Sequence, residues 1–464
     1  MYSFSLPFFY GFLPVFLILY LLLPARGRNG LLAAGSLLLY GWVQGGWLLL
    51  LVAVVAVTWL FGLLVDRFRR AARGFLAVYL TAAFGLLAAM KWLDPLFRSL
   101  RRDLGLPLPL VELALPLGLG ICLMQGMAYV TGVYRGEGPA KKEPVTLVIF
   151  LAGFPWQMAG PLLSWKDFAP QSARHPLALS RSARGVRRMA VGLGKTVVLA
   201  GTLALFPPIF AASQNRGVLF CWLYGLMVLL WLYYEVSGMM DLAVGLGELL
   251  GFQMPEVFAR PLSAGTLTGF WRRTLIPMGK WFYRFLYLPL RGRTGGRVRQ
   301  ALALTAVWVL VGLWWSPGWN LVIFGLINGL LVVLERFWLG PFLGRHPVVA
   351  RLGLWVVLCV QAVLLTGPDL AAAGEVLGGM IGCSAAQSIP AETAYYSASF
   401  FVVLALGVVG ATPLPAFLWG KLSASPRGRT VAAVLEPVLV LGLLLVSTGY
   451  LVDGGGGALL RYGW

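Results

Sequence analysis

The sequence is poor in the residues that usually carry chemistry at a protein site. Among its 464 residues there are only two histidines, His175 and His346, and four cysteines, and only 12% of the residues are charged. The cysteines are scattered without a C-x-x-C pair, which argues against a zinc site or a disulfide framework, so we expect no metal. So little charge cannot cover a soluble domain in which 59% of residues are apolar and the mean hydropathy is +0.82. The composition therefore predicts a polytopic membrane protein.

Acidic residues are the other scarce class. The chain has 17 Asp and Glu against 37 Lys and Arg, a formal net charge of +20. Such an excess can attract nucleic acid, but basic residues also collect in the cytoplasmic loops of membrane proteins and face anionic lipid headgroups. We favour the second interpretation, with membrane lipid and no nucleic acid as partner. The basic segments at 24–28, 66–73, 134–142 and 421–429 are then predicted to be cytoplasmic.

Apolar runs of spanning length recur along the whole chain. A membrane core of about 30 Å needs about 20 helical residues, so the runs predict an all-α bundle of about 11 to 13 membrane helices. We interpret residues 1–464 as a single transmembrane domain whose first span, near 8–23, is not a removed signal. Two segments do not look like simple spans: 145–163, which prolines interrupt, and 237–251, which is short and acidic. Irregular backbone at membrane depth needs surrounding protein or a water-filled cavity, so we expect both, as re-entrant pieces, to line an internal cavity.

The longest stretch between predicted spans, residues 253–300, is predicted to be a cytoplasmic amphipathic segment. Its centre, FWRRTLIPMGKWFYRFLYLPLRG (270–292), interleaves aromatic residues with Arg and Lys at roughly helical spacing. A helix of this composition lies in the plane of the membrane interface, with its rings in the lipid and its cations at the headgroups.

Several stretches form an ordered set that covers nearly the whole chain. They are ARGRNGLLAAGSLLLYGW (25–42), LPLGLG (115–120), YVTGVYRGE (129–137), FPWQMAGPL (154–162), SGMMDLAVGLGELLGFQMPEVFARP (237–261), FWRR to LYLPL (270–290) and GLWWSPGWN to LLVVLER (312–336). As a set they resemble the MBOAT family, the membrane-bound O-acyltransferases, and most closely the bacterial branch that O-acetylates alginate and related exopolysaccharides.

The resemblance implies a fold, a location and partners. The fold is a bundle with re-entrant segments around a central tunnel, in a bacterial inner (cytoplasmic) membrane. An acyl donor such as acyl-CoA enters from the cytoplasmic side, and the acceptor is reached from the other side. Partners are then expected among envelope polysaccharide synthases or acetylation proteins.

The histidines that the resemblance leads us to expect are missing. Family members carry histidines at the positions occupied here by Trp315, Asn328 and Leu275. Acyl transfer to a hydroxyl needs a group that accepts the hydroxyl proton, and histidine suits this because it titrates near neutral pH. An indole N–H only donates, and an amide does not titrate in this range. His175 and His346 lie in loops far along the chain from these motifs, and we do not expect either to replace the base.

Two carboxylates remain as candidate bases, Glu235 and Asp241. An acid within a membrane segment is costly to bury and marks a functional candidate. The alternative, which we favour, is that both hold the 237–251 segment by accepting hydrogen bonds from backbone N–H groups.

The candidate donor-binding residues are Arg272, Arg273, Gln157 and Trp271. The two arginines suit the phosphates of a CoA-type donor, since Arg makes bidentate phosphate contacts, but they suit lipid headgroups equally well. Gln157 and Asn328 could bond a thioester carbonyl or, as we favour, make hydrogen bonds between helices. Residues 312–336 are predicted to form an apolar hairpin with a short polar break near its start. Tryptophans near this break are more often packing residues than ligand-binding ones.

Three interpretations of function remain. The favoured one is a catalytically degenerate homologue in exopolysaccharide O-acylation that binds partners but does not transfer the acyl group, with the bulky Trp315 plugging the tunnel. The second is an active O-acyltransferase with a non-histidine base, or one that acts on a strong nucleophile such as a thiol. The third is a transporter of acyl donor or lipid on the same scaffold.

Overall fold

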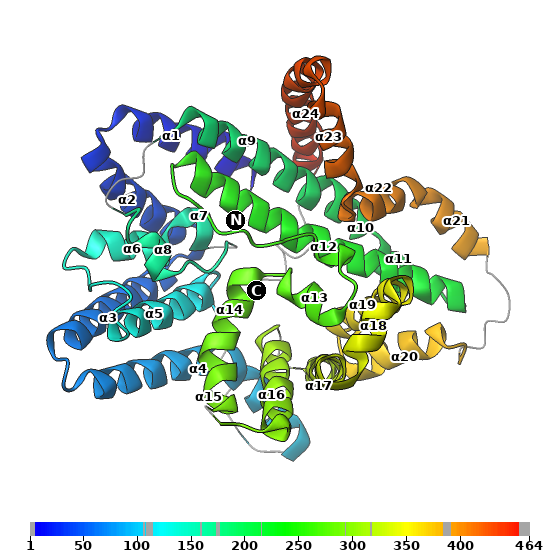
Figure 1. Cartoon of the computed structure of the whole chain (residues 1–464), viewed down its shortest axis with the longest axis horizontal. Helices are drawn as coiled ribbons and strands as arrows, with labels where there is room; N and C mark the ends of the chain where they lie inside the picture. The colour runs from blue at the N-terminus through cyan, green and yellow to red at the C-terminus, as the bar shows by residue number, and fades with distance from the viewer. Residues whose placement is uncertain are drawn as a thin grey trace. The chain divides into compact units, whose positions relative to one another are not determined.

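A computed structural model describes residues 5–104, 107, 115–157, 160–172, 177–214, 216–292, 294–315, 318–383 and 391–453. Every regular element in these ranges is helical, and none is a strand (Figure 1). The described chain divides into two compact units, one formed by the residues up to Met189 with Met240–Pro255, and the other by Ala190–Met239 with the described residues from Glu256 onward. His175 lies outside the described residues.

The first unit is built mainly from the N-terminal helices. Apolar faces of α3 pack against α4 and α5, and α2 packs against α6. It also contains most of α9 (Leu179–Leu193) and the end of α12 (Val218–Leu249). Its other elements are η1 (Pro7–Phe12), α1 (Leu13–Leu22), α2 (Ala25–Gln44), α3 (Trp47–Arg67), α4 (Ala72–Leu104), α5 (Leu119–Tyr134), α6 (Pro144–Ala152), α7 (Phe154–Gln157) and α8 (Trp165–Phe168).

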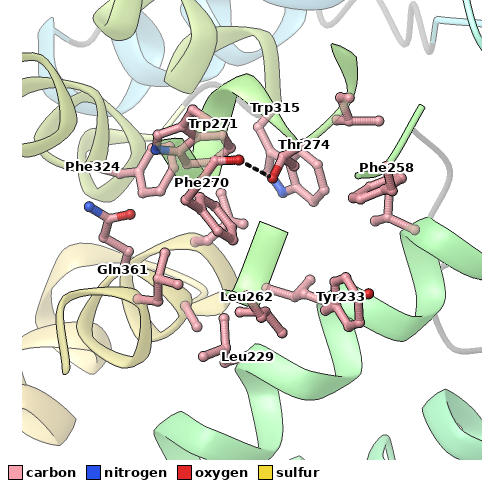
Figure 2. A pocket seen from close by; sticks show the side chains of 16 residues that line it. Leu229, Tyr233, Phe258, Leu262, Phe270, Trp271, Thr274, Trp315, Phe324 and Gln361 are labelled. Atoms are coloured by element: carbon pink, nitrogen blue, oxygen red, sulfur yellow. Dashed lines mark hydrogen bonds between the residues drawn. The ribbon is translucent and has the colours of Figure 1, made fainter. Parts of the chain in front are cut away.

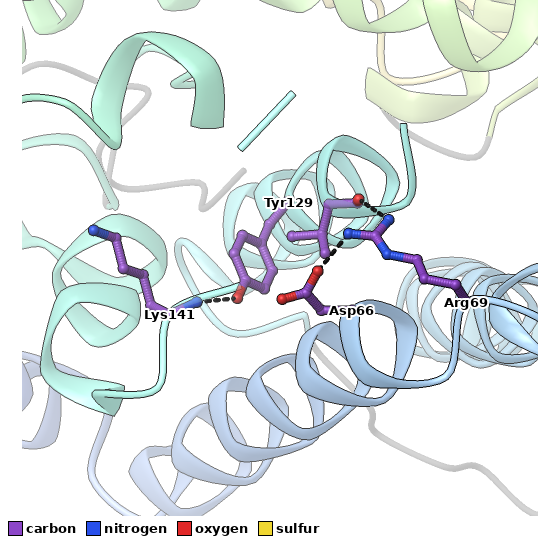
Figure 3. A network of polar contacts seen from close by, with 5 residues as sticks. Asp66, Arg69, Tyr129 and Lys141 are labelled. Atoms are coloured by element: carbon purple, nitrogen blue, oxygen red, sulfur yellow. Dashed lines mark hydrogen bonds and ion pairs between the residues drawn. The ribbon is translucent and has the colours of Figure 1, made fainter. Parts of the chain in front are cut away.

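Two basic segments meet at one end of this unit. Arg69 forms an ion pair with Asp66 and donates a hydrogen bond of 3.1 Å to the carbonyl of Val133 (Figure 3). The backbone N–H of Lys141 donates to the Tyr129 hydroxyl at 3.3 Å. The segments 66–73 and 134–142, predicted to lie on the same side of the membrane, are therefore neighbours.

The second unit holds the remaining helices and a cluster of buried apolar side chains centred on α12 and α19. Its elements, besides most of α12, are η2 (Gly194–Ala200), α10 (Gly201–Leu203), α11 (Phe206–Ala212), η3 (Pro261–Ser263), α13 (Leu267–Arg272), α14 (Ile276–Phe282), η4 (Tyr283–Tyr287), α15 (Leu288–Arg291), α16 (Arg297–Trp315), α17 (Trp319–Leu334), η5 (Glu335–Leu339), α18 (Gly340–Arg345), α19 (Pro347–Thr366), α20 (Leu370–Met380), α21 (Ala391–Ser399), α22 (Phe401–Ala411), α23 (Leu414–Ala424) and α24 (Pro426–Val452).

Helices α16 and α17 form the apolar hairpin that the sequence predicts, although residues 316–317 of its polar break lie outside the described chain. Glycines set how closely the two helices approach. A Cβ at Gly325 would come within 2.5 Å of the Trp308 carbonyl, and one at Gly329 within 2.7 Å of the Thr305 Cα. Gly325 and Gly329 are four residues apart, the spacing that lets membrane helices approach closely along one face.

The lengths and compositions of the helices agree with a multi-pass membrane protein. Eight described helices are long and apolar enough to cross a membrane, or nine if the bent pair α21 and α22 forms one span. Four shorter apolar helices include Pro7–Leu22 and Pro144–Gln157. The expected 11 to 13 spans are reached only if these shorter helices cross as well. The chain is thus an all-α polytopic membrane bundle, as predicted.

Local structure differs from the prediction in the 237–251 segment. It is not a separate re-entrant piece, because α12 runs without interruption from Val218 to Leu249. The segment was predicted to be re-entrant because it is short and acidic, but Asp241 is paired with Arg188 of α9 at 2.9 Å. This partner is distant in sequence, so the neutralised charge could not be foreseen.

The 145–163 segment is broken as predicted, but the break is at Gly153, between α6 and α7. Pro155 lies in the first turn of α7, where a proline needs no hydrogen-bonded N–H. Residues 158–159 lie outside the described chain, and the re-entrant course of the segment stays a prediction.

The 253–300 segment is not one interfacial helix. It is divided into α13, α14, η4 and α15, and Leu275 interrupts it with a left-handed backbone conformation. Trp281, Phe282 and Tyr287, whose rings were expected in the lipid, are buried within the protein.

Candidate functional site

A cavity of about 110 Å³ lies within the second unit (Figure 2). One face of α12 and one face of α19 form two of its walls, each with the i, i+3, i+4, i+7 spacing of a single helix face. In Figure 2 the labelled rings of α13, α16 and α17 gather above the cavity, and the α12 side chains lie below it. The lining residues are Leu229, Leu232, Tyr233, Val236, Phe258, Leu262, Phe270, Trp271, Thr274, Leu275, Trp315, Phe324, Leu358, Gln361, Ala362 and Leu365.

The structure brings two of the three expected histidine positions to the walls of this cavity. Trp315, from the end of α16, and Leu275, from the loop between α13 and α14, both line it. The two residues are 40 positions apart in the sequence, and only the family resemblance indicated that they belong to the same site. Trp315 is partly buried and packs against the apolar cluster of this unit.

Asn328, the third position, lies one layer behind the wall. Its side chain is fully buried on α17. The Trp271 indole N–H donates to Asn328 Oδ1 at 2.8 Å, and Asn328 Nδ2 donates to the Phe324 carbonyl at 2.8 Å. Trp271 and Phe324 both line the cavity. Asn328 therefore acts as a brace that fixes the Trp271 ring in the wall, while its bond to the Phe324 carbonyl stays within α17.

Helix α13 is held at both of its ends, by α17 and by the first residue of η5. The Trp271–Asn328 hydrogen bond holds its C-terminal end. At its N-terminal end, the Glu335 carboxylate accepts hydrogen bonds from the backbone N–H groups of Leu267 and Thr268, at 2.6 and 2.7 Å. These N–H groups have no partner within a helix, and an acid near a helix N-terminus also interacts favourably with the helix dipole.

The loop that carries Leu275 is held in an unusual backbone conformation. Leu275 has φ +45° and Arg260 has φ +51°, in the left-handed region that residues with a Cβ rarely adopt. Two backbone hydrogen bonds fix the loop, from Ala259 N–H to the Arg273 carbonyl at 2.9 Å and from Ile276 N–H to the Val257 carbonyl at 3.0 Å. They align the extended chain after α12 with the end of α13.

The two candidate carboxylates lie away from the cavity wall. Glu235 is fully buried on α12. At about 100° per residue, it points about a third of a turn away from the centre of the face that carries Leu229, Leu232, Tyr233 and Val236. Asp241 belongs to the first unit, where Arg188 binds it at 2.9 Å. An ion pair thus accounts for Asp241, in place of the expected bonds to backbone N–H groups.

The candidate donor-binding residues other than Trp271 do not line the cavity. Arg272 and Arg273 are exposed at the end of α13, and Arg273 approaches the Ser263 hydroxyl at 3.4 Å. Gln157 belongs to the first unit and is fully buried at the end of α7. His346 is exposed after α18, with its ring 4.8 Å from that of Phe342. The binding roles predicted for the arginines and Gln157 stay predictions.

Sequence reasoning did not single out Gln361 and Glu335 as functional. Gln361 is an amide within the apolar run of α19, and the family resemblance does not mark its position. Glu335 lies near the end of the 312–336 stretch, and nothing in the sequence indicates that it caps α13.

Comparisons with known proteins identify the family. A family model described as "MBOAT, membrane-bound O-acyltransferase family" matches residues 143–343, which include the cavity walls except that of α19. A probable alginate O-acetylase, AlgI, of Pseudomonas putida is 32% identical over 337 residues, 71% of this chain and 69% of that protein. The chain belongs to the MBOAT family.

Two further relatives match over more of the chain. The probable alginate O-acetylase AlgI of Pseudomonas syringae pv. tomato is 29% identical over 384 residues, 80% of this MBOAT chain and 74% of that protein. The peptidoglycan O-acetyltransferase of Helicobacter pylori is 26% identical over 417 residues, 81% of this chain and 79% of that protein. The names of these relatives share O-acetylation and differ in the acceptor.

The chemistry open to the cavity follows from its walls. None of the sixteen lining residues is a histidine, an acid, an amine or a cysteine, and the hydroxyls are those of Tyr233 and Thr274. Thr274 donates to the Phe270 carbonyl at 2.9 Å (Figure 2). Such walls can bind an uncharged group and exclude water, but they offer no group that titrates near neutral pH.

Proposed function

We propose that this MBOAT protein takes part in the O-acylation of a bacterial exopolysaccharide as a non-catalytic, partner-binding member of its family. One observation supports the proposal above all. Trp315 and Leu275, at two positions where the resemblance places histidines, line a cavity, and none of its described lining residues can accept a proton near neutral pH.

The third position supports the same conclusion. A base must approach the hydroxyl that it deprotonates within hydrogen-bond distance, directly or through one water. The Asn328 amide does not titrate in this range, and both ends of it are engaged, with Trp271 and with the Phe324 carbonyl. Asn328 preserves the packing of the site and not its proton transfer.

The biological setting comes from the relatives. Probable alginate O-acetylases and a peptidoglycan O-acetyltransferase resemble the chain over most of its length. They support our proposal that the protein lies in the bacterial inner membrane, beside an envelope polysaccharide synthase or acetylation proteins, where it would hold an assembly together.

An active acyltransferase with a different base is the second candidate. Glu235 favours it, because this carboxyl is fully buried on the helix that forms one cavity wall. Bringing the carboxyl to the cavity would need a rotation of α12 by about a third of a turn, or a change of the side-chain rotamer.

One assay separates the two candidates. Purified protein in detergent receives radiolabelled acetyl-CoA, with and without envelope proteins encoded beside it, and label on protein and glycan is measured. We expect no transfer above a protein-free control, together with stable co-purification with the polysaccharide synthase.

Transfer that Glu235→Gln abolishes, while Glu375→Gln at an exposed carboxyl on α20 does not, would overturn the non-catalytic proposal. Asp241→Asn serves as a further test, with thermal unfolding as a check of folding because this substitution removes the ion pair with Arg188.

A further inference from the structure

Four arginines gather at one end of the α16–α17 hairpin. They are Arg291, Arg297, Arg299 and Arg336. None of them forms an ion pair with an acid among the described residues. In the sequence, Glu335 is the one acid between positions 257 and 368. Its carboxylate is already bonded to the backbone N–H groups at the start of α13. The cluster therefore carries positive charge that no described acid neutralises.

Hydrogen bonds fix two of the four guanidinium groups. Arg299 Nε donates to the Leu290 carbonyl at 2.9 Å, which ties the first turn of α16 to α15. Arg336 Nη2 donates to Gln300 Oε1 at 3.2 Å, and Gln300 Nε2 donates to the Gly295 carbonyl at 3.0 Å. An arginine has five N–H donors, and neither group has a further hydrogen-bond acceptor among the described residues. Both side chains are exposed, so the remaining donors are held in place and open to a ligand.

The loop between α15 and α16 leaves room for one of these groups. A Cβ at Gly292 would come within 3.0 Å of both Cζ and Nη2 of Arg299. Gly292 also has φ +70°, a conformation that glycine adopts without steric cost. Glycine at this position therefore lets the guanidinium lie against the loop backbone, where α15 and the start of α16 pack together (Figure 1).

The depth of the cluster in a membrane follows from α16. Its 19 residues span about 28 Å, close to the thickness of a membrane core, so Arg297 and Arg299 lie at one boundary of that core. Leu302 is three residues after Arg299, a neighbour on the helix surface, and it is 66% exposed. Ala306, one turn further, is exposed as well. Arginines at headgroup depth beside an exposed apolar helix face match the two parts of a phospholipid.

We propose that this cluster binds an anionic phospholipid, with the phosphate on the remaining N–H groups of Arg299 and Arg336 and an acyl chain along the exposed face of α16. Arginine suits phosphate because its planar N–H groups contact two oxygens at once. A zwitterionic lipid fits less well, because its ammonium group would lie among arginines that no described acid neutralises. None of the four arginines lines the cavity, and the lipid site does not depend on whether the protein transfers an acyl group.

The test compares two lipids on the whole chain in detergent by native mass spectrometry. Phosphatidylglycerol and phosphatidylethanolamine with identical acyl chains are titrated against wild type and Arg299→Gln/Arg336→Gln. We expect wild type to bind phosphatidylglycerol at least about tenfold more tightly than phosphatidylethanolamine, and the double variant to favour it by about twofold or less.

Two further variants separate a site from general attraction. Arg427→Gln/Arg429→Gln is the matched control, because it removes two exposed arginines from the start of α24, another long apolar helix. This variant should keep the wild-type preference. Arg299→Lys/Arg336→Lys keeps both charges but loses the planar groups, and its preference should fall between those of wild type and the Gln pair.

Four results would overturn the proposal. An unchanged preference in Arg299→Gln/Arg336→Gln would show that these arginines do not bind the phosphate. An equal loss in Arg427→Gln/Arg429→Gln would show general attraction of headgroups to basic residues. Displacement of phosphatidylglycerol by millimolar sodium phosphate would show that the cluster takes a free anion. Failure of both the Gln and the Lys pair at 299 and 336 to fold, measured by thermal unfolding, would show that the arginines hold the fold and not a lipid.

Discussion

The indole N–H of Trp271 donates a hydrogen bond of 2.8 Å to the side-chain oxygen of Asn328. This bond joins the short helix α13 to α17 and fixes a tryptophan in the cavity wall. The ring of Trp271 also lies 4.8 Å from that of Trp308 on α16, measured between centroids. The resemblance places a histidine at position 328, but here the Asn328 side chain holds a cavity-wall residue in place.

Asn328→Ala should destabilise the protein by about 1–3 kcal/mol, because it leaves the Trp271 N–H buried without an acceptor. Thermal unfolding in detergent measures the change. Trp271→Phe removes the donor, so adding Asn328→Ala to Trp271→Phe should cost clearly less than adding it to wild type. Equal costs in both backgrounds would show that the bond contributes nothing.

The all-helical membrane fold could be predicted from the sequence, because the length of an apolar run is a local signal. The α16–α17 hairpin followed from two apolar runs around a short polar break, and Gly325 and Gly329 are spaced for close packing. The course of α12 was predicted wrongly. The pairing of Asp241 with Arg188, 53 residues away, depends on which helices pack together.

The site was predictable only as a set of positions. The family pattern singled out Trp315 and Leu275, and the structure places both at one cavity. The family pattern could not indicate that Asn328 braces Trp271, because this role depends on the hydrogen bond between the two side chains. Asn328 and Gln361 are both amides in apolar helices, and only the three-dimensional structure shows that the first has hydrogen-bond partners and the second has none among the described residues.

Glu335→Ala should lower stability by about 1–3 kcal/mol, because two N–H groups at the start of α13 lose a charged acceptor. Glu335→Gln keeps an oxygen acceptor but loses the charge, and it should fall between Ala and wild type. Thermal unfolding ranks the three proteins. The exposed Glu375→Ala, on α20, should leave stability unchanged. A loss in Glu335→Gln as large as that in Glu335→Ala would indicate that the charge, and not the geometry of capping, matters.

Arg260 offers a test of backbone strain outside the cavity, because it is exposed and has φ +51°. The left-handed conformation costs an ordinary residue about 1–2 kcal/mol, and Asn tolerates it better than most. Arg260→Asn should therefore raise the unfolding temperature, and Arg260→Val, with its branched Cβ, should lower it. Lys280→Val at an exposed position of α14 is the matched control and should have a smaller effect. Equal changes of the unfolding temperature in Arg260→Val and Lys280→Val would contradict backbone strain at Arg260.

Trp315 should limit the length of the group that the cavity accepts. Trp315→Ala removes a ring from the cavity wall at the end of α16, so S-ethyl octanethioate, whose acyl chain has eight carbons, should bind at least about tenfold more tightly to the variant. The variant should lose stability by less than the about 3–5 kcal/mol typical of a fully buried tryptophan, since Trp315 is only partly buried. Trp338→Ala removes a tryptophan that is 65% exposed, and it should change neither property. Ligand-observed NMR in matched micelles measures the affinities, and equal binding of the long thioester to wild type and Trp315→Ala would show that the indole does not close the cavity.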